Sequence, residues 1–317
     1  MKKKLSFVVP VYNEEQNLPL LYKKLSELMN SCTENYDAQV VLVNDGSRDR
    51  SWQIIQELAR QDFRIKGICF TRNFGHQMAL TAGYDAVDGD AIIGLDADLQ
   101  DPPELIYEMV KKWEEGFAIV YARRISRNDG FLKDMTATLY YKLLHSVADV
   151  SIPRNVGDFR LIDKRVLEQV RLCRERARYL RGIVAWTGFT HTYVDFNRPE
   201  RAAGSSGYSW FKILKLGFDG FTGFSLFPLR IAAFAGVFII LTGSLMFVYI
   251  AFDAFLRGVR YPLFKWLVTI IYIFMGVQCI LMWFLGEYIG RMYDQQKERP
   301  LYVVDETVGF TPEKKKG

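Results

Sequence analysis

Short apolar runs alternate with amphipathic segments over the first 125 residues of the chain. The apolar runs have the length of strands and lie at residues 5–12, 38–45, 65–70, 91–96 and 117–122. Between them apolar residues recur at helical spacing, as in Leu18, Leu21, Leu25 and Leu28. This alternation predicts an α/β fold with a mostly parallel, Rossmann-like sheet that is covered on both faces. Ligands of such sheets bind beyond the carboxyl ends of the strands.

The last third of the chain has a different pattern, with two long runs that carry no charge. These runs are residues 231–252 and 266–285. Each is long enough to cross a bilayer as a helix, which takes about 20 apolar residues, and a pair of buried core helices is the alternative. Residues 208–228 combine aromatic residues with lysines, which is typical of helices in a membrane interface. Ordinary core helices are the alternative there.

These patterns predict four parts of the chain. They are a cytoplasmic domain at 1–207, interfacial helices at 208–228, two transmembrane helices within 229–288 and a tail at 289–317. Near the membrane, the side with both termini carries six Lys and Arg residues against three in the intervening loop. This excess predicts a multi-pass protein of the inner membrane with cytoplasmic termini. A tail strand at 301–304 is predicted to pair with another copy, which would give a homo-oligomer.

Composition and charge argue against several classes of protein. The net charge is +5 with acidic and basic residues interleaved, so nucleic acid is not a predicted partner. The four cysteines lack CxxC spacing, which argues against a disulfide framework or a zinc site. The N-terminal apolar run is too short for a signal peptide and has no small-residue cleavage site. The sequence contains neither GxGxxG nor GxxxxGKS/T, which argues against dinucleotide-binding and P-loop proteins.

The fourth apolar run brings polar residues to the end of a predicted strand. Asp96, Asp98 and Gln100 follow there, before Pro102 turns the chain into a helix. Carboxylate and carboxamide oxygens suit Mg²⁺ or Mn²⁺, ions that often share their ligand shell with substrate phosphates. These three residues are therefore the candidate metal ligands. The alternative is a polar turn in which the aspartates only cap the helix.

Polar residues also follow the first three predicted strands. Glu14, Asp45 and Arg72 occupy these positions in chain order. On a shared rim, the carboxylates would accept hydrogen bonds from sugar hydroxyls or a base N–H, and Arg72 would bind phosphates. Simpler interpretations apply to their neighbours, because Asn13 and Asp49 are candidate helix N-caps.

Four motifs in this order resemble the family 2 glycosyltransferases. They are PVYNEE, VNDGSRD, TRNFGHQMAL and DADLQDPPE. The chain is similar, more narrowly, to the polyprenyl-phosphate type, which includes dolichol-phosphate mannose synthase and bacterial undecaprenyl-phosphate (bactoprenol) glucosyltransferases. This resemblance implies a GT-A type fold and a nucleotide-sugar donor.

The resemblance also implies roles for the residues at the strand ends. The donor nucleoside would be held by Pro10, Tyr12, Glu14 and Asp45. Asp96, Ala97 and Asp98 would lie against its ribose, its diphosphate and the metal, with Gln100 as a further metal ligand. His76 departs from the family, because it stands where a Lys is often found.

A basic segment follows the fifth predicted strand and contains Arg123, Arg124 and Lys133. Arg offers a fork of donors to a phosphate and Lys offers a point charge. The resemblance implies that Arg124 and Lys133, with Arg123 beside them, bind the phosphate of a lipid acceptor. A solvated basic loop is the alternative. Within a later Gly- and Ser-rich loop, the resemblance places Arg201 on the donor diphosphate or the acceptor.

The segment VGDFRL resembles the active-site segment of the family and adds Asp158 to Asp98 as a candidate catalytic residue. Inverting transfer usually needs a general base. A phosphate monoester has a second pKa of about 6, however, and is largely dianionic at pH 7. Asp158 is therefore predicted to orient the acceptor or a basic partner, with proton removal as the alternative. The following helical pattern, at 175–189, is interpreted as structural.

Together these features predict a metal-dependent, inverting transfer of glucose from UDP-glucose to undecaprenyl phosphate. GDP-mannose, UDP-galactose and UDP-aminoarabinose derivatives are alternative donors. A processive polysaccharide synthase is disfavoured because no QxxRW motif follows the acceptor segment. An inactive scaffold or sugar-lipid carrier is the alternative from a different class, and a flippase is a candidate partner.

Overall fold

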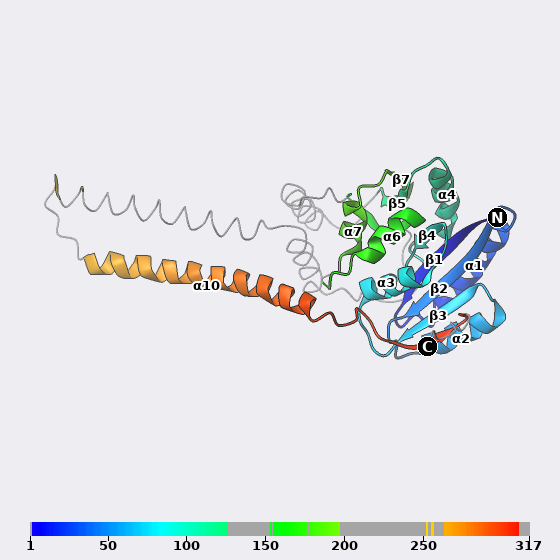
Figure 1. Cartoon of the computed structure of the whole chain (residues 1–317), viewed down its shortest axis with the longest axis horizontal. Helices are drawn as coiled ribbons and strands as arrows, with labels where there is room; N and C mark the ends of the chain where they lie inside the picture. Colours follow the sequence, from blue (N-terminus) through cyan, green and yellow to red (C-terminus); the bar gives the residue numbers. More distant parts are fainter. Residues whose placement is uncertain are drawn as a thin grey trace. The chain divides into compact units, whose positions relative to one another are not determined.

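The computed structural model of the chain is built on one mixed sheet (Figure 1). The structure describes residues 2–125, 153, 155–176, 178–196, 252, 255–256 and 263–310. The predicted features outside these residues include the interfacial helices at 208–228, Lys133 of the basic segment and the loop with Arg201.

Eight strands among the described residues form the sheet, in the order β7-β5-β6-β4-β1-β2-β3-β8. Their bounds are β1 Lys3–Val11, β2 Tyr36–Asn44, β3 Ile65–Phe70, β4 Ala91–Gly94, β5 Ile119–Arg124, β6 Val156–Asp163, β7 His191–Phe196 and β8 Val304–Val308. Four strand pairs are parallel, whereas β4–β6, β5–β6 and β3–β8 are antiparallel. The α/β class and the first five strands are confirmed. The sheet is mostly parallel, as predicted, and it is mixed because β6 and β8 run against their neighbours.

Helices cover both faces of this sheet (Figure 1). Their bounds are α1 Leu18–Cys32, α2 Ser51–Gln61, α3 His76–Ala86, η1 Pro103–Leu105, α4 Ile106–Glu114, α6 Lys164–Leu172 and α7 Leu180–Trp186. On one face, α1, α2 and α4 contribute Leu21, Ile55 and Met109 to the main core. On the other face α3 packs on β1, where a Cβ on Gly83 would lie only 2.1 Å from Val8 Cγ1. Glycine therefore permits this close approach of helix and strand.

The chain divides into two compact units. The second unit, Val147–Asp149 with Phe218–Glu298, contains the 34-residue helix α10, Leu263–Gln296. The predicted span at 266–285 lies within α10, and the one at 231–252 lies outside the described residues except for Phe252.

Among the helices of the described residues, none is both long and apolar enough to cross a bilayer. This finding overturns the prediction of a multi-pass protein of the inner membrane. That prediction rested on the uncharged runs, on the pattern at 208–228 and on the excess of Lys and Arg near the side with both termini. The helix itself extends past the uncharged run to Glu287 and Arg291, which form an ion pair with a distance of 3.0 Å.

The C-terminal tail returns to the first unit and forms β8 there. The strand lies at Val304–Val308 rather than at 301–304, and it pairs with β3 of the same chain rather than with another copy. Because β3 would otherwise present an open edge, this pairing satisfies backbone groups that could recruit a foreign strand.

Candidate active site

The carboxyl ends of β1, β2, β3 and β4 lie at one edge of the sheet, and the turns after them carry the predicted donor residues. Asp45 is buried directly after β2. Its carboxylate accepts hydrogen bonds from the backbone N–H of Phe74 at 2.7 Å and of Gly75 at 3.0 Å. Burial raises the pKa of Asp45, and these two donors oppose the rise. Asp45 therefore holds the turn between β3 and α3.

The turns after β1 and β2 are hydrogen-bonded to each other. Asn13 adopts a φ of 57°, and its N–H donates to Ser47 Oγ at 2.9 Å. The neighbouring Glu14 lies in the same turn and is partly exposed. Asn13 is not an N-cap, since Asn17 precedes α1. Asp49 lies one residue before Arg50, the residue that precedes α2, and its Oδ1 accepts the backbone N–H of Ser51 at 3.0 Å, so it caps the helix as predicted. Both residues also join the two turns, because Asn13 Oδ1 accepts the N–H of Arg48 and Asp49 Oδ2 accepts the N–H of Glu15.

Pro10, Tyr12 and Arg72 differ in their exposure at this edge. Pro10 is buried within β1, whereas Tyr12 is 44% exposed. Arg72 is exposed in the turn after β3, where its guanidinium lies 4.0 Å from the centre of the Phe74 ring. Tyr12 and Arg72 are thus accessible to a ligand.

Asp96, Ala97 and Asp98 follow β4, and the turn that they begin is held by its own carboxylates. Asp98 Oδ1 accepts a hydrogen bond from the backbone N–H of Gln100 at 3.2 Å. Asp101 Oδ2 accepts one from the backbone N–H of Asp96 at 3.1 Å. Ala97 and Gln100 are buried, whereas Asp96 and Asp98 are partly exposed. The three predicted metal ligands are therefore neighbours in one compact turn.

The electrostatics of this turn fit a bound cation. Burial and the charges of Asp158 and Asp98 raise the pKa of Asp96. Burial and the charge of Asp96 raise the pKa of Asp101 to about 7, and none of the described residues donates a hydrogen bond to its buried Oδ1. A divalent cation relieves carboxylates crowded in this way. Among the described residues, no group of three or more His, Cys, Asp and Glu side chains is placed to hold a metal ion. An ion in this turn would therefore meet at most two carboxylates, together with the Gln100 carboxamide.

Asp158 lies on β6 and is buried among cations. Arg160 Nη2 donates to its Oδ1 at 2.8 Å, and Arg181 Nη2 donates to its Oδ2 at 3.1 Å. Gln77 Nε2 and His76 Nε2 lie 3.3 Å and 3.4 Å from the same Oδ2. Burial favours the neutral acid, but Arg181, His76 and Arg160 outweigh it and hold the pKa of Asp158 well below its usual range. Such a carboxylate is a poor general base at neutral pH.

His76 begins α3 and connects two carboxylates of the site. Its Nε2 lies 3.6 Å from Asp96 Oδ1 and 3.4 Å from Asp158 Oδ2. Burial opposes protonation, but the hydrogen bond to Asp158 and the charge of Asp96 prevail and raise the pKa of His76 to about 9. The imidazole is therefore a cation at neutral pH, as a Lys at this position would be.

Arg160 and Arg181 were not among the predicted site residues. Arg160 is fully buried and follows Asp158 by two positions in a strand, so both side chains point to the same face. This period of two is the signal that could have identified it. Arg181 comes from α7, in the segment interpreted as structural, and no local pattern connects it with Asp158.

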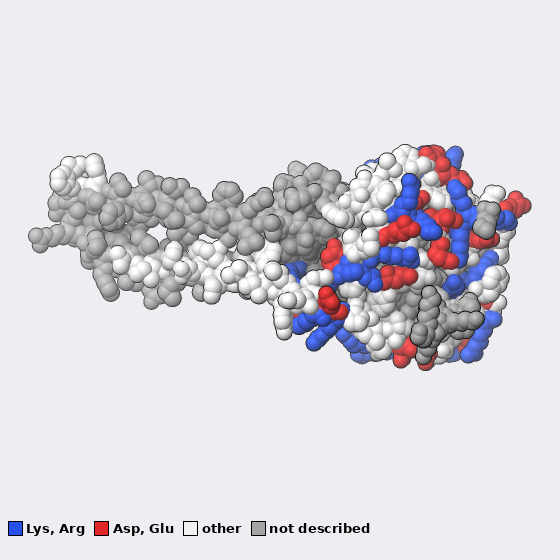
Figure 2. Space-filling model, viewed as in Figure 1, with Lys and Arg blue, Asp and Glu red and all other residues white. Residues whose placement is uncertain are grey.

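The two predicted acceptor arginines within the described residues point to opposite faces, as successive strand residues do. Arg123 forms a bidentate ion pair with Asp195 of β7, with distances of 2.6 and 2.8 Å. Arg124 lies against β6, where its Nη2 is 3.3 Å from the position of a Cβ on Gly157. On the face shown in Figure 2, Lys and Arg side chains are interspersed with Asp and Glu over the first unit. Because side chains alternate along β6, this position places Arg124 on the face of the strand opposite to the Asp158 side chain.

Comparison with known proteins agrees with this architecture. The model of the family described as "Glycosyl transferase family 2" matches residues 6–171. The chain belongs to this family. The GT-A-like α/β fold and the recognition of the family from its four motifs are thereby confirmed.

Relatives match almost the whole chain. An uncharacterized glycosyltransferase of Bacillus subtilis, YkcC, is 45% identical and covers 96% of this chain and 94% of its own. The bactoprenol glucosyl transferase of Shigella phage SfV is 41% identical and covers 95% of this chain and 98% of its own. The solved structure of glucosyl-3-phosphoglycerate synthase from Mycobacterium tuberculosis is 16% identical, with a TM-score of 0.46 over 68% of this chain and 76% of its own. That structural likeness is too weak to extend to function.

Proposed function

We propose that this glycosyltransferase moves glucose from UDP-glucose to the phosphate of a bactoprenol-type polyprenyl lipid. The observation that carries the proposal is the match with relatives named bactoprenol glucosyl transferase over 95% of the chain. The cluster of cations around Asp158, at the same sheet edge as Asp96 and Asp98, supports transfer between two phosphate-bearing substrates.

The donor would lie along the turns after β1, β2 and β3. Tyr12 offers an exposed ring and Glu14 an acceptor for sugar or base donors. Asp45 would act mainly by holding the turn with Arg72, whose guanidinium suits a diphosphate.

Asp96, Asp98 and Gln100 would hold Mg²⁺ or Mn²⁺, which fits the crowding of carboxylates in this turn. When bound, the ion would neutralise charge on the leaving diphosphate. The chain contributes the carboxylates and keeps them together through the bond from Gln100 N–H to Asp98.

Asp158 would act as an organiser of cations rather than as a base. A lipid phosphate is largely deprotonated at pH 7 because its second pKa is about 6, so the attacking oxygen needs no proton removed. The pKa of Asp158, held low by Arg181, fits this assignment. Arg181, with 28% of its side chain exposed, would stabilise the charge of the attacking phosphate. A single displacement at C1 inverts the anomeric configuration.

The proposal is tested with purified protein, Mn²⁺ and undecaprenyl phosphate in detergent. Radiolabelled UDP-glucose, UDP-galactose and GDP-mannose are offered separately, and radioactivity in the extracted lipid is counted. We expect UDP-glucose to label the lipid, and EDTA and Asp98→Asn to abolish labelling. Labelling from another donor alone would show that the transferred sugar is not glucose. No labelled lipid from any donor would contradict transferase activity and favour a carrier.

A further inference from the structure

The C-terminal segment from Arg299 to Phe310 is attached to the first unit by many contacts. Its strand β8 pairs antiparallel with β3, with Gly67 opposite Val308 and Cys69 opposite Glu306. On the side of α2, Glu306 Oε2 accepts hydrogen bonds from Trp52 Nε1 at 2.9 Å and from Gln56 Nε2 at 3.3 Å. We call this segment the C-terminal strap.

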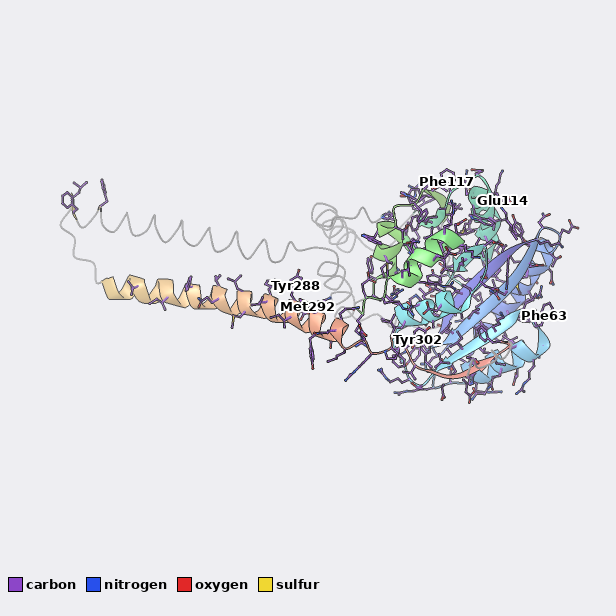
Figure 3. All side chains as sticks on the ribbon, viewed as in Figure 1. Phe63, Glu114, Phe117, Tyr288, Met292 and Tyr302 are labelled. Atoms are coloured by element: carbon purple, nitrogen blue, oxygen red, sulfur yellow. The ribbon has the colours of Figure 1, made fainter. Side chains whose placement is uncertain are left out.

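Before β8, the strap meets the end of β3 through Tyr302. The Tyr302 ring stacks on Phe70 with centroids 5.1 Å apart and an interplanar angle of 17°. The Tyr302 hydroxyl donates to Asp85 Oδ2 of α3 at 2.9 Å, and Figure 3 shows Tyr302 beside this helix. Asp85 is also paired with Arg174 at 2.9 Å. Tyr302 therefore connects the end of β3 with the end of α3.

The contacts of Tyr302 continue into the turn that we assign to the donor. Phe70 packs edge-to-face on Phe74, with centroids 5.6 Å apart. The backbone N–H of Thr71 donates to the carbonyl of Val303 in the strap at 3.2 Å. Phe74 in turn stacks under the Arg72 guanidinium and donates its N–H to Asp45.

We propose that Tyr302 is a positioning residue for nucleotide binding, through Phe70 and the turn at residues 71–75. The inference rests on the proposed function, because it takes that turn to bind the donor nucleotide. Two successive ring contacts and one backbone hydrogen bond connect the strap with Asp45 and Arg72. Within the strap, Tyr302 contacts Phe70 whereas Glu306 contacts α2, so the two ends of the strap can be tested separately.

The test measures UDP binding by calorimetry in the presence of Mn²⁺, and KM for UDP-glucose and for undecaprenyl phosphate. Tyr302→Ala is expected to weaken UDP binding and to raise the KM of UDP-glucose by about threefold to tenfold, which is the worth of an aromatic pair. KM for the lipid should not change. Amide hydrogen exchange at residues 71–75 should become faster.

Matched variants separate positioning from stability. Tyr302→Phe keeps the stacked ring and should bind UDP nearly as the wild type does. Glu306→Gln removes a charge at the α2 end of the strap and should leave UDP binding unchanged. If Tyr302→Ala fails to fold, Tyr302→Leu retains apolar contact with Phe70 and should show the same donor-specific defect in smaller degree.

Two results would overturn the inference. One is a folded Tyr302→Ala or Tyr302→Leu protein with wild-type UDP affinity and wild-type exchange at residues 71–75. The other is an equal rise in both KM values, which would indicate a general structural role. A wild-type protein that neither binds UDP nor labels lipid would instead overturn the proposed function, and the nucleotide role of Tyr302 with it.

Discussion

The two ends of the candidate site are built from different interactions. At the nucleotide end, the buried Asp45 carboxylate is held by neutral backbone N–H groups of Phe74 and Gly75. At the reaction end, the buried Asp158 carboxylate is held by the charged side chains of Arg160 and Arg181 with His76. Neutral hydrogen bonds each contribute little net stability, whereas one member removed from a buried ion cluster leaves an uncompensated charge. The reaction end should therefore tolerate substitution far less than the nucleotide end.

The largest effect is expected for Asp158→Ala. This change leaves the fully buried Arg160 without its carboxylate, and should lower the free energy of unfolding by about 3–5 kcal/mol. Urea denaturation measures the loss. Asp195→Ala, which breaks the exposed pair with Arg123, is the matched control and should leave the free energy of unfolding nearly unchanged. Equal losses in the two variants would show that the buried ion cluster contributes no more to stability than an exposed ion pair.

A smaller effect, on the reaction alone, is expected for Arg181→Gln. Its guanidinium is partly exposed, so folding should persist while kcat falls by about 100-fold through the loss of a charged donor at the reacting phosphates. Steady-state kinetics and a thermal melt measure both. Arg174→Gln, at the pair with Asp85, serves as the control with near-normal kcat. A normal kcat in Arg181→Gln would assign the residue to structure only.

The pH dependence of stability should reveal the charge on His76. Its pKa is about 9 in the folded protein and about 6.5 when unfolded. A raised pKa gives stability that is complete below about pH 6.5 and is lost as the pH rises through about 9. After allowance for a side chain that is 34% exposed, the loss should be about 1–2 kcal/mol. Urea melts at pH 6.5 and 9.5 in EDTA measure it, and His76→Gln should lack this component.

The smallest effect is expected for Asp45→Asn. The amide oxygen can still accept the N–H of Phe74 or Gly75, so KM for UDP-glucose should rise only about threefold. Asp45→Ala removes both bonds and should raise it further. An Asp45→Asn defect as large as that of Arg181→Gln would show that the nucleotide end also depends on charge.

The fold was predictable where the pattern was local. The apolar runs alone predict β1 to β5, because strands covered on both faces are continuously apolar. β6 was missed since Asp158 and Arg160 interrupt its apolar residues at the very positions that serve the site. β8 was placed three residues early and assigned a partner in another copy, because pairing between Gly67 and Val308 leaves no local signal.

The candidate site was likewise predictable only where its residues lie close together in the sequence. Asp96, Asp98 and Gln100 were identifiable because one turn contains them all. The low pKa of Asp158 depends first on Arg181, which comes from a separate helix, and this contact is set by packing rather than by spacing. The predicted role of Asp158 as an orienting residue stays a prediction, and the cations around it support that role over proton removal.

The pairing of β8 with β3 has a consequence for synthesis of the chain. About 230 residues separate the end of β3 from the start of β8. At a ribosomal rate of about 5–20 residues per second, the edge of β3 stays open for roughly 10–50 s after β3 is made. During that interval the nascent domain offers an unpaired strand to its neighbours on the polysome. The length of chain between the two paired strands therefore sets how long the nascent domain is at risk of misassembly.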